Sequence, residues 1–261
     1  MNYQNVYNSW KANPELFWME AAKDIDWFKF PSHALNDDKK PFYTWFSDGQ
    51  VNTCFNAVDR HVQRGLGKKT AIIYDSPISG VKSKLTFEEL LEKTASLAGA
   101  LVDSGIQKGD RVIIYMPMIP EAIISMLACA RLGAIHSVVF GGFASKELAV
   151  RIDDAKPKAI LSGSCGIEPS GVVPYKPLLD KAIAESDHKP DFCVIYQRQE
   201  LESSLVPGQD YEWYEFQKNS ASIPCSAVSG THPLYILYTS GTTGNPKGIV
   251  HTHYVRANYC T

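Results

Sequence analysis

The sequence predicts an α/β fold in which helices cover a mostly parallel sheet. Helix-like and strand-like segments alternate at short intervals from residue 86 to residue 196. The strand-like segments are continuous apolar runs, which is typical of parallel strands buried on both faces. The last apolar run leads into a loop rich in glycine and hydroxyl side chains, and ligands of such sheets bind at the carboxyl ends of strands.

The composition is that of a globular protein with a substantial core. Of its 261 residues, 44% are hydrophobic and 21% are charged, and the net charge is −2. No basic block offers the positive face that binding to nucleic acid requires. The first ten residues lack the order of a signal or transit peptide, and residues 119–132 are too short and too polar to span a bilayer. We therefore expect a cytoplasmic protein without nucleic-acid or membrane partners.

The cysteine and histidine spacings predict no metal site. The six cysteines are far apart and form no Cys-x-x-Cys pair, so they indicate neither a zinc site nor a disulfide framework. His136 lies in an apolar segment and is expected to be a structural histidine. His251 and His253 are two residues apart, but no third ligand accompanies them.

The first 60 residues are expected to form an aromatic-rich lid on a larger body, which residues 61–261 provide. Asn13 followed by Pro14 indicates a helix start, with a capping side chain and proline at the first helical position. The simpler interpretation of the rings is a small core that covers the surface of the larger body.

The middle of the chain is regular. Thr86 and Glu89 have the spacing of a capping box, and one apolar helical face follows as far as Gly105. Residues 197–231 lose the pattern and are expected to form a polar loop, and a strand at 234–238 follows it. Between Gly105 and this loop the pattern predicts strands at 111–115, 135–140, 159–161 and 192–196, and helices at 120–132, 145–154 and 177–185.

Residues 239–248, TSGTTGNPKG, carry the clearest chemical signal. They hold four hydroxyls, three glycines and one lysine, directly after a predicted strand. Glycines let the backbone approach an anion closely, so that successive N–H groups form a nest. The hydroxyls add donors, and Lys247 adds a mobile positive charge. This set of groups suits the triphosphate of a nucleotide.

The loop differs from the two common nucleotide motifs. A P-loop needs Gly-Lys-Ser/Thr five positions after its first glycine, where this chain has Pro246 after Gly241 and Ile249 after Gly244. No Gly-x-Gly-x-x-Gly occurs, so hydride chemistry has no support. The alternative, a flexible Gly/Thr surface turn, is disfavoured by the strand before the loop and the Pro-Lys-Gly that ends it.

Residues 238–248, YTSGTTGNPKG, resemble the phosphate-binding signature of the adenylate-forming superfamily, which includes the acyl-CoA synthetases. Residues 115–122 (YMPMIPEA) and 128–143 (ACARLGAIHSVVFGGF) are similar to its acetyl- and propionyl-CoA synthetase branch. The propionyl type is favoured by CGIEP at 165–169, VPYKPLL at 173–179 and RIDDAKP at 151–157. The resemblance implies a layered parallel-sheet subdomain of the N-terminal domain of adenylate-forming enzymes, incomplete in this chain.

The resemblance also implies an activity. It is the ATP-dependent activation of a short-chain carboxylate, propionate before acetate, to an acyl-adenylate and then to acyl-CoA, with ATP, Mg²⁺ and coenzyme A taking part. The family's loop closes over the β- and γ-phosphates of ATP, which assigns the catalytic role to Lys247. The implied phosphate-binding residues are Thr239, Ser240, Gly241, Thr242, Thr243, Gly244 and Lys247.

Two further segments correspond to coenzyme A contacts in the family. Glu168 and Pro169 match a loop in which relatives often continue with Gly-Arg, whereas this chain has Gly171 at the basic position and lacks that fork of donors. Gly141 and Gly142 match the thioester channel. The alternatives are an ordinary solvated turn at Glu168 and Pro169, and a tight strand-to-helix turn at the two glycines.

Members of this family are longer than this chain. We therefore expect residues 61–261 to be a truncated first part of the adenylation domain, with the C-terminal domain absent and the chain alone inactive. Two other interpretations stay open. One is a non-catalytic remnant that binds nucleotide or coenzyme A. The other is a different adenylate-forming enzyme, such as a luciferase-like or peptide-synthetase domain, and residues 128–143 argue against it.

Overall fold

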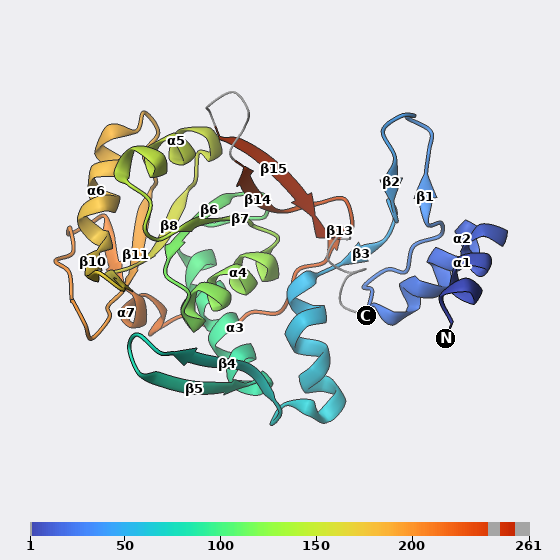
Figure 1. Ribbon diagram of the computed structural model, residues 1–261, viewed down its shortest axis with the longest axis horizontal. Coiled ribbons are helices and arrows are strands. Elements are labelled where there is room, and N and C mark those ends of the chain that lie inside the picture. Colours follow the sequence, from blue (N-terminus) through green and yellow to red (C-terminus); the bar gives the residue numbers. More distant parts are fainter. Residues whose placement is uncertain (1, 240–245, 254–261) are drawn as a thin grey trace.

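The computed structural model describes residues 2–239 and 246–253. A seven-stranded sheet forms its centre, in the order β12-β11-β8-β6-β7-β14-β15 (Figure 1). Its strands are parallel except for the β14–β15 pair, which is antiparallel, so the expected α/β class is confirmed. The strands are β6 (Arg111–Met116), β7 (Ile135–Phe140), β8 (Ala159–Gly163), β11 (Phe192–Tyr196), β12 (Asp210–Glu212), β14 (Pro233–Thr239) and β15 (Lys247–Thr252).

Helices cover both faces of the sheet. One face packs against α3 (Phe87–Asp103), α4 (Pro120–Leu132) and α7 (Trp213–Gln217), and the other against α5 (Ser145–Ala155) and α6 (Tyr175–Glu185). Alternate residues of β6 supply the two cores: Val112 and Ile114 join the first, and Ile113 and Tyr115 join the second. All four side chains are fully buried. Burial on both faces explains why β6 is a continuous apolar run in the sequence.

Local signals set the start of α3 and both ends of α4 where the sequence predicts them. The amide of Glu89 donates to the Thr86 hydroxyl at 3.2 Å, and the amide of Thr86 donates to the Glu89 carboxylate at 2.8 Å, which completes the capping box of α3. Helix α4 starts with Pro120 at its first position and ends at Gly133, whose φ of 72° is left-handed.

The expected polar loop at 197–231 is wrong in part. It contains β12, α7 and the short strand β13 (Val228–Ser229). Strand β12 is only three residues long and is recognisable through its parallel pairing with β11 rather than through apolar character. Two hairpins are also absent from the prediction. They are β4 (Thr70–Ser76) with β5 (Val81–Thr86), and β9 (Cys165–Glu168) with β10 (Gly171–Pro174).

The N-terminal segment lies beside the sheet and its helices (Figure 1). Asn13 caps α2 by accepting a hydrogen bond from the Leu16 amide at 3.0 Å, as the sequence predicts. Trp18, Trp27 and Trp45 pack around a small core of their own. The division at residue 60 stays a prediction. The segment comprises α1 (Tyr3–Ala12), α2 (Pro14–Ala21), the 3₁₀ turn η1 (Ala22–Asp24), β1 (Leu35–Asn36), β2 (Thr44–Trp45) and β3 (Gln50–Val51), and the π-helical turns η2 (Phe55–Asp59) and η3 (Val62–Leu66) follow.

Among the described residues, no helix is both long enough and apolar enough to cross a bilayer.

Candidate functional site

The predicted phosphate loop connects the two strands of the β14–β15 hairpin. Thr239 pairs with Lys247, and Tyr238 pairs with Gly248. We call these four residues the hairpin stem. The first and last of the predicted phosphate-binding residues therefore face each other where the stem opens. The other predicted members lie outside the described residues: Ser240, Gly241, Thr242, Thr243 and Gly244.

Strand β14 is less buried than the sequence predicts. Leu234 is buried, but the side chains from Tyr235 to Thr239 are only partly buried or exposed, and Leu237 is 47% exposed. The reason is its position, because β14 lies one strand from the end of the sheet, between parallel β7 and antiparallel β15. Because β14 runs parallel to β7, the hairpin stem opens at the end of the sheet where the carboxyl end of β7 also lies.

Helix α5 contacts the hairpin stem. The Tyr238 hydroxyl donates to Asp154 Oδ2 at 2.6 Å, and the Arg151 guanidinium lies 5.4 Å from the centroid of the Tyr238 ring. Burial, together with the hydrogen bond to Asp154, raises the pKa of the Tyr238 hydroxyl, so that the hydroxyl stays protonated as a donor. A β-carbon at Gly248 would lie 3.2 Å from Tyr238 Cε1 and 3.3 Å from Asp154 Oδ2. Glycine at 248 therefore lets β15 pass close to this contact.

The strand order reverses at β6. Strand β7 lies on one side of β6 and β8 on the other, and α5 makes the crossover between them. In open parallel sheets, ligands bind outside the carboxyl ends of the strands at such a reversal. Gly141 follows β7 there, and a β-carbon on it would lie 2.3 Å from the Tyr175 ring and 2.9 Å from the Met116 carbonyl carbon. Packing alone therefore requires a glycine at 141.

Gly142 and Glu168, predicted from two separate stretches, come together at this reversal. A β-carbon at Gly142 would lie 2.9 Å from Glu168 Oε1. Glu168 is half-buried at the end of β9, and Pro169 is exposed in the turn that follows. Tyr175 lies under this hairpin, because a β-carbon at Gly166 would lie only 2.1 Å from its hydroxyl. The turn after β7 and the β9–β10 hairpin thus form one surface.

Gly171 occupies a backbone conformation that favours glycine. Its φ is +127°, and no atom lies within 4 Å of a β-carbon placed on it. A larger side chain would have space but would strain the backbone. The conformation of the β9–β10 turn therefore favours glycine at position 171.

Four residues that the sequence analysis gave no role support these segments. The Tyr115 hydroxyl donates to the Phe143 carbonyl at 2.9 Å, and the Arg151 guanidinium lies 4.7 Å from the centroid of the Phe143 ring. Tyr175 and Asp154 make the contacts described above. For Arg151 and Asp154 a signal existed, because residues three apart on a helix share a face. Tyr115 and Tyr175 lie in the stretches 115–122 and 173–179, which resemble the family. The hydrophobic periodicity of the sequence did not predict a supporting role for either tyrosine.

Two of the three histidines considered above, His136 and His251, lie against the same ring, and His253 has a different partner. His136 lies beside the ring of Tyr235, with ring centroids 5.6 Å apart, and His251 stacks on Tyr235 at 4.6 Å. His253 is fully buried, and its Nδ1 lies 3.0 Å from the Thr53 hydroxyl. Burial lowers the pKa of His253 to about 3, so this ring is neutral at pH 7. Within residues 2–239 and 246–253, no potential metal cluster includes these histidines.

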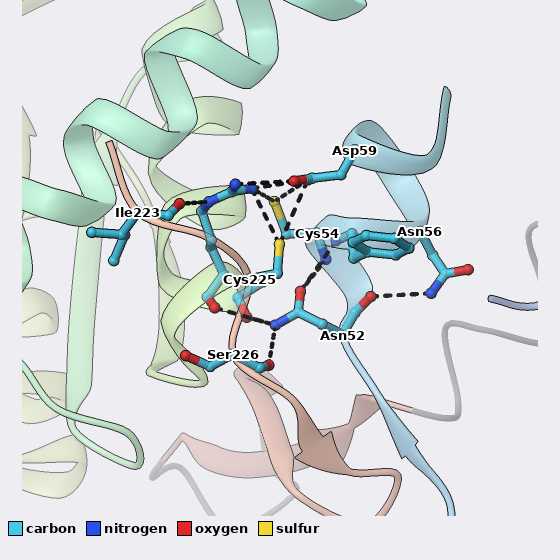
Figure 2. A network of polar contacts seen from close by, with 10 residues as sticks. Asn52, Cys54, Asn56, Asp59, Ile223, Cys225 and Ser226 are labelled. Atoms are coloured by element: carbon cyan, nitrogen blue, oxygen red, sulfur yellow. Dashed lines mark hydrogen bonds and ion pairs between the residues drawn. The ribbon is translucent and has the colours of Figure 1, made fainter. Parts of the chain in front are cut away.

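Two cysteines that are far apart in the sequence meet in the fold. The ligand atoms of Cys54, Asp59 and Cys225 lie within 4.8 Å of one another, in the network shown in Figure 2. The Arg131 guanidinium already fills this cluster. It donates to both Asp59 oxygens, at 2.8 and 2.9 Å, and lies 3.1 Å from Cys225 Sγ. A cation would meet this fixed positive charge, so the cluster is a structural ion pair.

Asn52 completes this junction between three parts of the chain (Figure 2). Its amide nitrogen donates to the carbonyls of Ala130 and Ser226, each at 2.8 Å, and its side-chain oxygen accepts from the Cys54 amide. The residues before η2, the end of α4 and the chain before β13 are thereby joined. Because their partners lie far away in the sequence, residue spacing did not reveal these contacts.

Two family models together match nearly the whole chain. Residues 58–261 match the AMP-binding enzyme family, and residues 3–57 match the acetyl-coenzyme A synthetase N-terminus.

Curated relatives agree with these matches. The chain is 51% identical over 249 residues to acyl-CoA synthetase short-chain family member 3, mitochondrial, of Rattus norvegicus, which covers 95% of this chain and 36% of the relative. It is 42% identical over 248 residues to acetyl-coenzyme A synthetase of Streptomyces avermitilis, which covers 95% of this chain and 38% of that relative. The chain spans little more than a third of the length of either protein. It belongs to the AMP-binding enzyme family and, within that family, to the acetyl-coenzyme A synthetase branch.

Proposed function

We propose that this chain supplies the phosphate-binding loop and the coenzyme A entry surface of a ligase that activates a short-chain carboxylate with ATP. The observation that carries the proposal is the pairing of Thr239 with Lys247 at the open end of the hairpin stem. A hydroxyl and an ammonium group there flank the glycine-rich residues, at the sheet edge where parallel-sheet proteins bind ligands. Membership of the AMP-binding enzyme family supports the same role.

In the proposed reaction, a carboxylate oxygen attacks the α-phosphorus of ATP, and pyrophosphate leaves. The coenzyme A thiolate then attacks the acyl carbon, and AMP leaves. Such displacements depend mainly on positioning and on neutralising phosphate charge, and Lys247 would supply that charge at the β- and γ-phosphates. Mg²⁺, when bound, shares this neutralisation, since it binds chiefly through substrate phosphates. In the hairpin stem, the Thr239 hydroxyl would donate a hydrogen bond to the phosphate oxygens of ATP.

Coenzyme A would approach along the surface that Gly142, Glu168 and Pro169 form. The partly open position of Glu168 and the exposure of Pro169 support this assignment. Gly141 packs against Tyr175, and this contact already explains why it is a glycine. Of the two glycines predicted for the thioester channel, we therefore propose that Gly142 is the one that lines the path of coenzyme A. The glycine at 171 removes a basic group from this surface, and we expect weaker coenzyme A binding than in relatives with arginine there.

We infer propionate as the favoured acid and acetate as the next, from the stretches around residues 151, 165 and 173 that favour the propionyl type. A methylene group in an apolar pocket is worth only about 1–3 kcal/mol. Pyrophosphate exchange with acetate, propionate and butyrate, compared by kcat/KM, tests this preference. A higher kcat/KM for acetate or butyrate would contradict it.

The central test uses a completed version of the protein, in which the C-terminal region of a relative follows this chain. Lys247→Ala should lower ATP–pyrophosphate exchange by about 100-fold or more, as expected for the loss of a charge that stabilises the transition state. Lys146→Ala, an exposed lysine on α5, is the matched control and should leave exchange unchanged. An unchanged rate of ATP–pyrophosphate exchange in Lys247→Ala would contradict the proposed function.

A non-catalytic remnant that binds nucleotide or coenzyme A is the second candidate, and the glycine at 171 favours it. It would bind ATP without exchanging pyrophosphate in the completed version. The inactivity of residues 1–261 alone stays a prediction, which an assay of thioester formation by the purified chain can test. The expected cytoplasmic location also stays a prediction, since the names of several relatives include mitochondrial.

A further inference from the structure

We propose that Asp154 and Arg151 of α5 are positioning residues, which hold the hairpin stem and the turn after β7 in a fixed relation. The inference rests on the proposed function, because it gives these residues a purpose only if the stem carries a phosphate-binding loop. Both residues come from one helix, and each contacts Tyr238 of the stem. Figure 1 shows α5 beside the ends of β14 and β15.

The first contact fixes the stem. Tyr238 donates its hydroxyl to Asp154 Oδ2 at 2.6 Å, a short hydrogen bond to a charged acceptor. Tyr238 is adjacent to Thr239 in the chain, and its cross-strand partner Gly248 is adjacent to Lys247. The bond to α5 therefore acts one residue away from both described members of the predicted phosphate site.

The second contact links the stem to the other predicted site. The Arg151 guanidinium lies 4.7 Å from the centroid of Phe143 and 5.4 Å from that of Tyr238, within the range of cation–π attraction. Phe143 follows Gly142 directly, in the turn assigned to coenzyme A. Arg151 is only 7% exposed and is itself held by Glu147 at 3.1 Å. One buried cation thus contacts the ring at the stem and the ring at the glycine turn.

The neighbouring backbone is fitted to this arrangement. The Ser137 hydroxyl of β7 donates to the Ile236 carbonyl of β14 at 3.0 Å, which ties the two strands together below the stem. At Gly248, a β-carbon would meet Ile236, Tyr238 and Asp154 within 3.3 Å. The hairpin stem can therefore move relative to α5 only if the Ser137–Ile236 and Tyr238–Asp154 hydrogen bonds and the close packing around Gly248 are disrupted.

Asp154 is exposed, and its hydrogen bond lies at the surface. Such a bond contributes little to global stability, and so the geometry of the stem is the property that it most affects. Misplacing a catalytic group by about 1 Å can cost a large factor in rate. Loss of the Tyr238–Asp154 bond should therefore weaken the use of ATP more than it weakens the fold.

The experiment measures ATP–pyrophosphate exchange by the completed version and the midpoint of thermal unfolding. Tyr238→Phe and Asp154→Ala should each raise KM for ATP about 3- to 10-fold, the factor that corresponds to one net hydrogen bond. The double variant should be no worse than either single variant, because both remove one interaction. Asp154→Asn should stay near the parent value, since its amide oxygen can still accept the hydroxyl hydrogen.

The control is Glu185→Ala on the neighbouring helix α6, which removes an exposed acid with a 3.8 Å ion pair to Lys181. It should leave KM and the unfolding midpoint unchanged. Arg151→Met should raise KM for ATP and, in the thioester-forming step, KM for coenzyme A, since Arg151 contacts both rings. Arg151→Lys, which keeps the charge and loses the planar fork, should give an intermediate effect.

Three results would overturn the inference: an unchanged KM for ATP in Tyr238→Phe and Asp154→Ala, a double variant whose effect is the product of the singles, or a lowered unfolding midpoint with unaltered kinetics. The Lys247→Ala variant separates this outcome from failure of the proposed function. If Lys247→Ala abolishes exchange while the Tyr238 and Asp154 variants do not alter KM, only the positioning role fails. If Lys247→Ala leaves exchange intact, the proposed function fails first.

Discussion

Gly142 lies against Glu168, so close that a β-carbon at Gly142 would stand 2.9 Å from the carboxylate oxygen Oε1. The two residues are separated by α5, β8 and most of β9 in the chain. They meet because the sheet reverses its strand order at β6 and brings the connections after β7 and β8 to one edge.

The neighbouring glycines at 141 and 142 should respond differently to alanine. A β-carbon at Gly141 would collide with the Tyr175 ring and with the backbone of Met116, so Gly141→Ala should lower the free energy of unfolding by about 1–3 kcal/mol. At Gly142 a β-carbon would meet the ends of two side chains, Glu168 Oε1 at 2.9 Å and Phe140 Cε1 at 3.0 Å, and the carboxylate and the exposed Phe140 ring can both move aside. Gly142→Ala should therefore change stability by less than about 0.5 kcal/mol and act on KM for coenzyme A. Urea unfolding and steady-state kinetics check the two effects, and equal losses of stability would contradict the prediction.

Gly248→Ala should disturb the hairpin stem. The added methyl would lie 3.0 Å from Ile236 Cγ2 and 3.2 Å from Tyr238 Cε1, so we expect a loss of about 1–3 kcal/mol in the free energy of unfolding. The control is Gly67→Ala, where the nearest atom to a β-carbon is 3.5 Å away, an ordinary contact distance. Urea unfolding of the 261-residue chain compares the two variants. A Gly67 variant as unstable as the Gly248 variant would show that close contact is not the cause.

The buried pair of Arg131 and Asp59 should be costly to break. Their side chains are 5% and 11% exposed, and removing one partner leaves a buried charge without compensation. Asp59→Ala should lower the free energy of unfolding by about 3–5 kcal/mol. Asp75→Ala removes a pair to Lys82 in which both side chains are more than half exposed, and it should cost less than about 1 kcal/mol. Denaturant unfolding of both variants checks the contrast, which similar losses would contradict.

Acid should destabilise the protein through His253. Burial lowers the pKa of this histidine from 6.5 to about 3 in the folded state, while the unfolded chain titrates near 6.5. Between these values the unfolded state binds a proton that the folded state does not. The free energy of unfolding therefore falls as the pH drops below 6.5, by up to about 1.4 kcal/mol per pH unit down to about pH 3. Above pH 6.5 this group contributes no pH dependence.

Urea unfolding at pH 7, 6 and 5 tests this linkage. His253→Gln keeps a polar side chain without a titrating ring, and it should flatten the decline between pH 6.5 and 5. His251→Gln is the comparison, because His251 lies two residues away and stacks on Tyr235 in a less buried position. An identical decline in the parent chain and in the His253 variant would show that other groups cause the acid sensitivity.

Local chemistry explains which elements the sequence predicts well. The bounds expected for α4, β7 and β11 agree with the structure, because α4 lies between Pro120 and Gly133 and the two strands are mostly apolar segments with polar or glycine residues after them. Strand β12 was not predicted, since its three residues, Asp210–Glu212, include two acids and are ordered by pairing with β11. The register of β12 depends on its neighbour β11, and the periodicity of the sequence carries no information about which strands are neighbours.

The candidate site also has a part that the sequence predicts and a part that depends on tertiary contacts. A string of glycines and hydroxyls next to Lys247 is visible in the sequence, because the phosphate chemistry lies in adjacent residues. The hydrogen bond from Tyr238 to Asp154 spans 84 positions, and no spacing rule connects the two. The same holds for Cys225 and Asp59, which are 166 positions apart. Tertiary contacts of this range depend on strand order, which the sequence pattern alone did not determine.

The boundary between the two matched families has a practical consequence for protein engineering. It falls between residues 57 and 58, inside the network that places Asn52 and Cys54 on one side and Asp59 and Arg131 on the other. A chimera spliced at this point would combine half of the junction from each parent. Exchange of N-terminal segments between relatives should therefore succeed only when the donor and the recipient carry matching side chains at all of these positions.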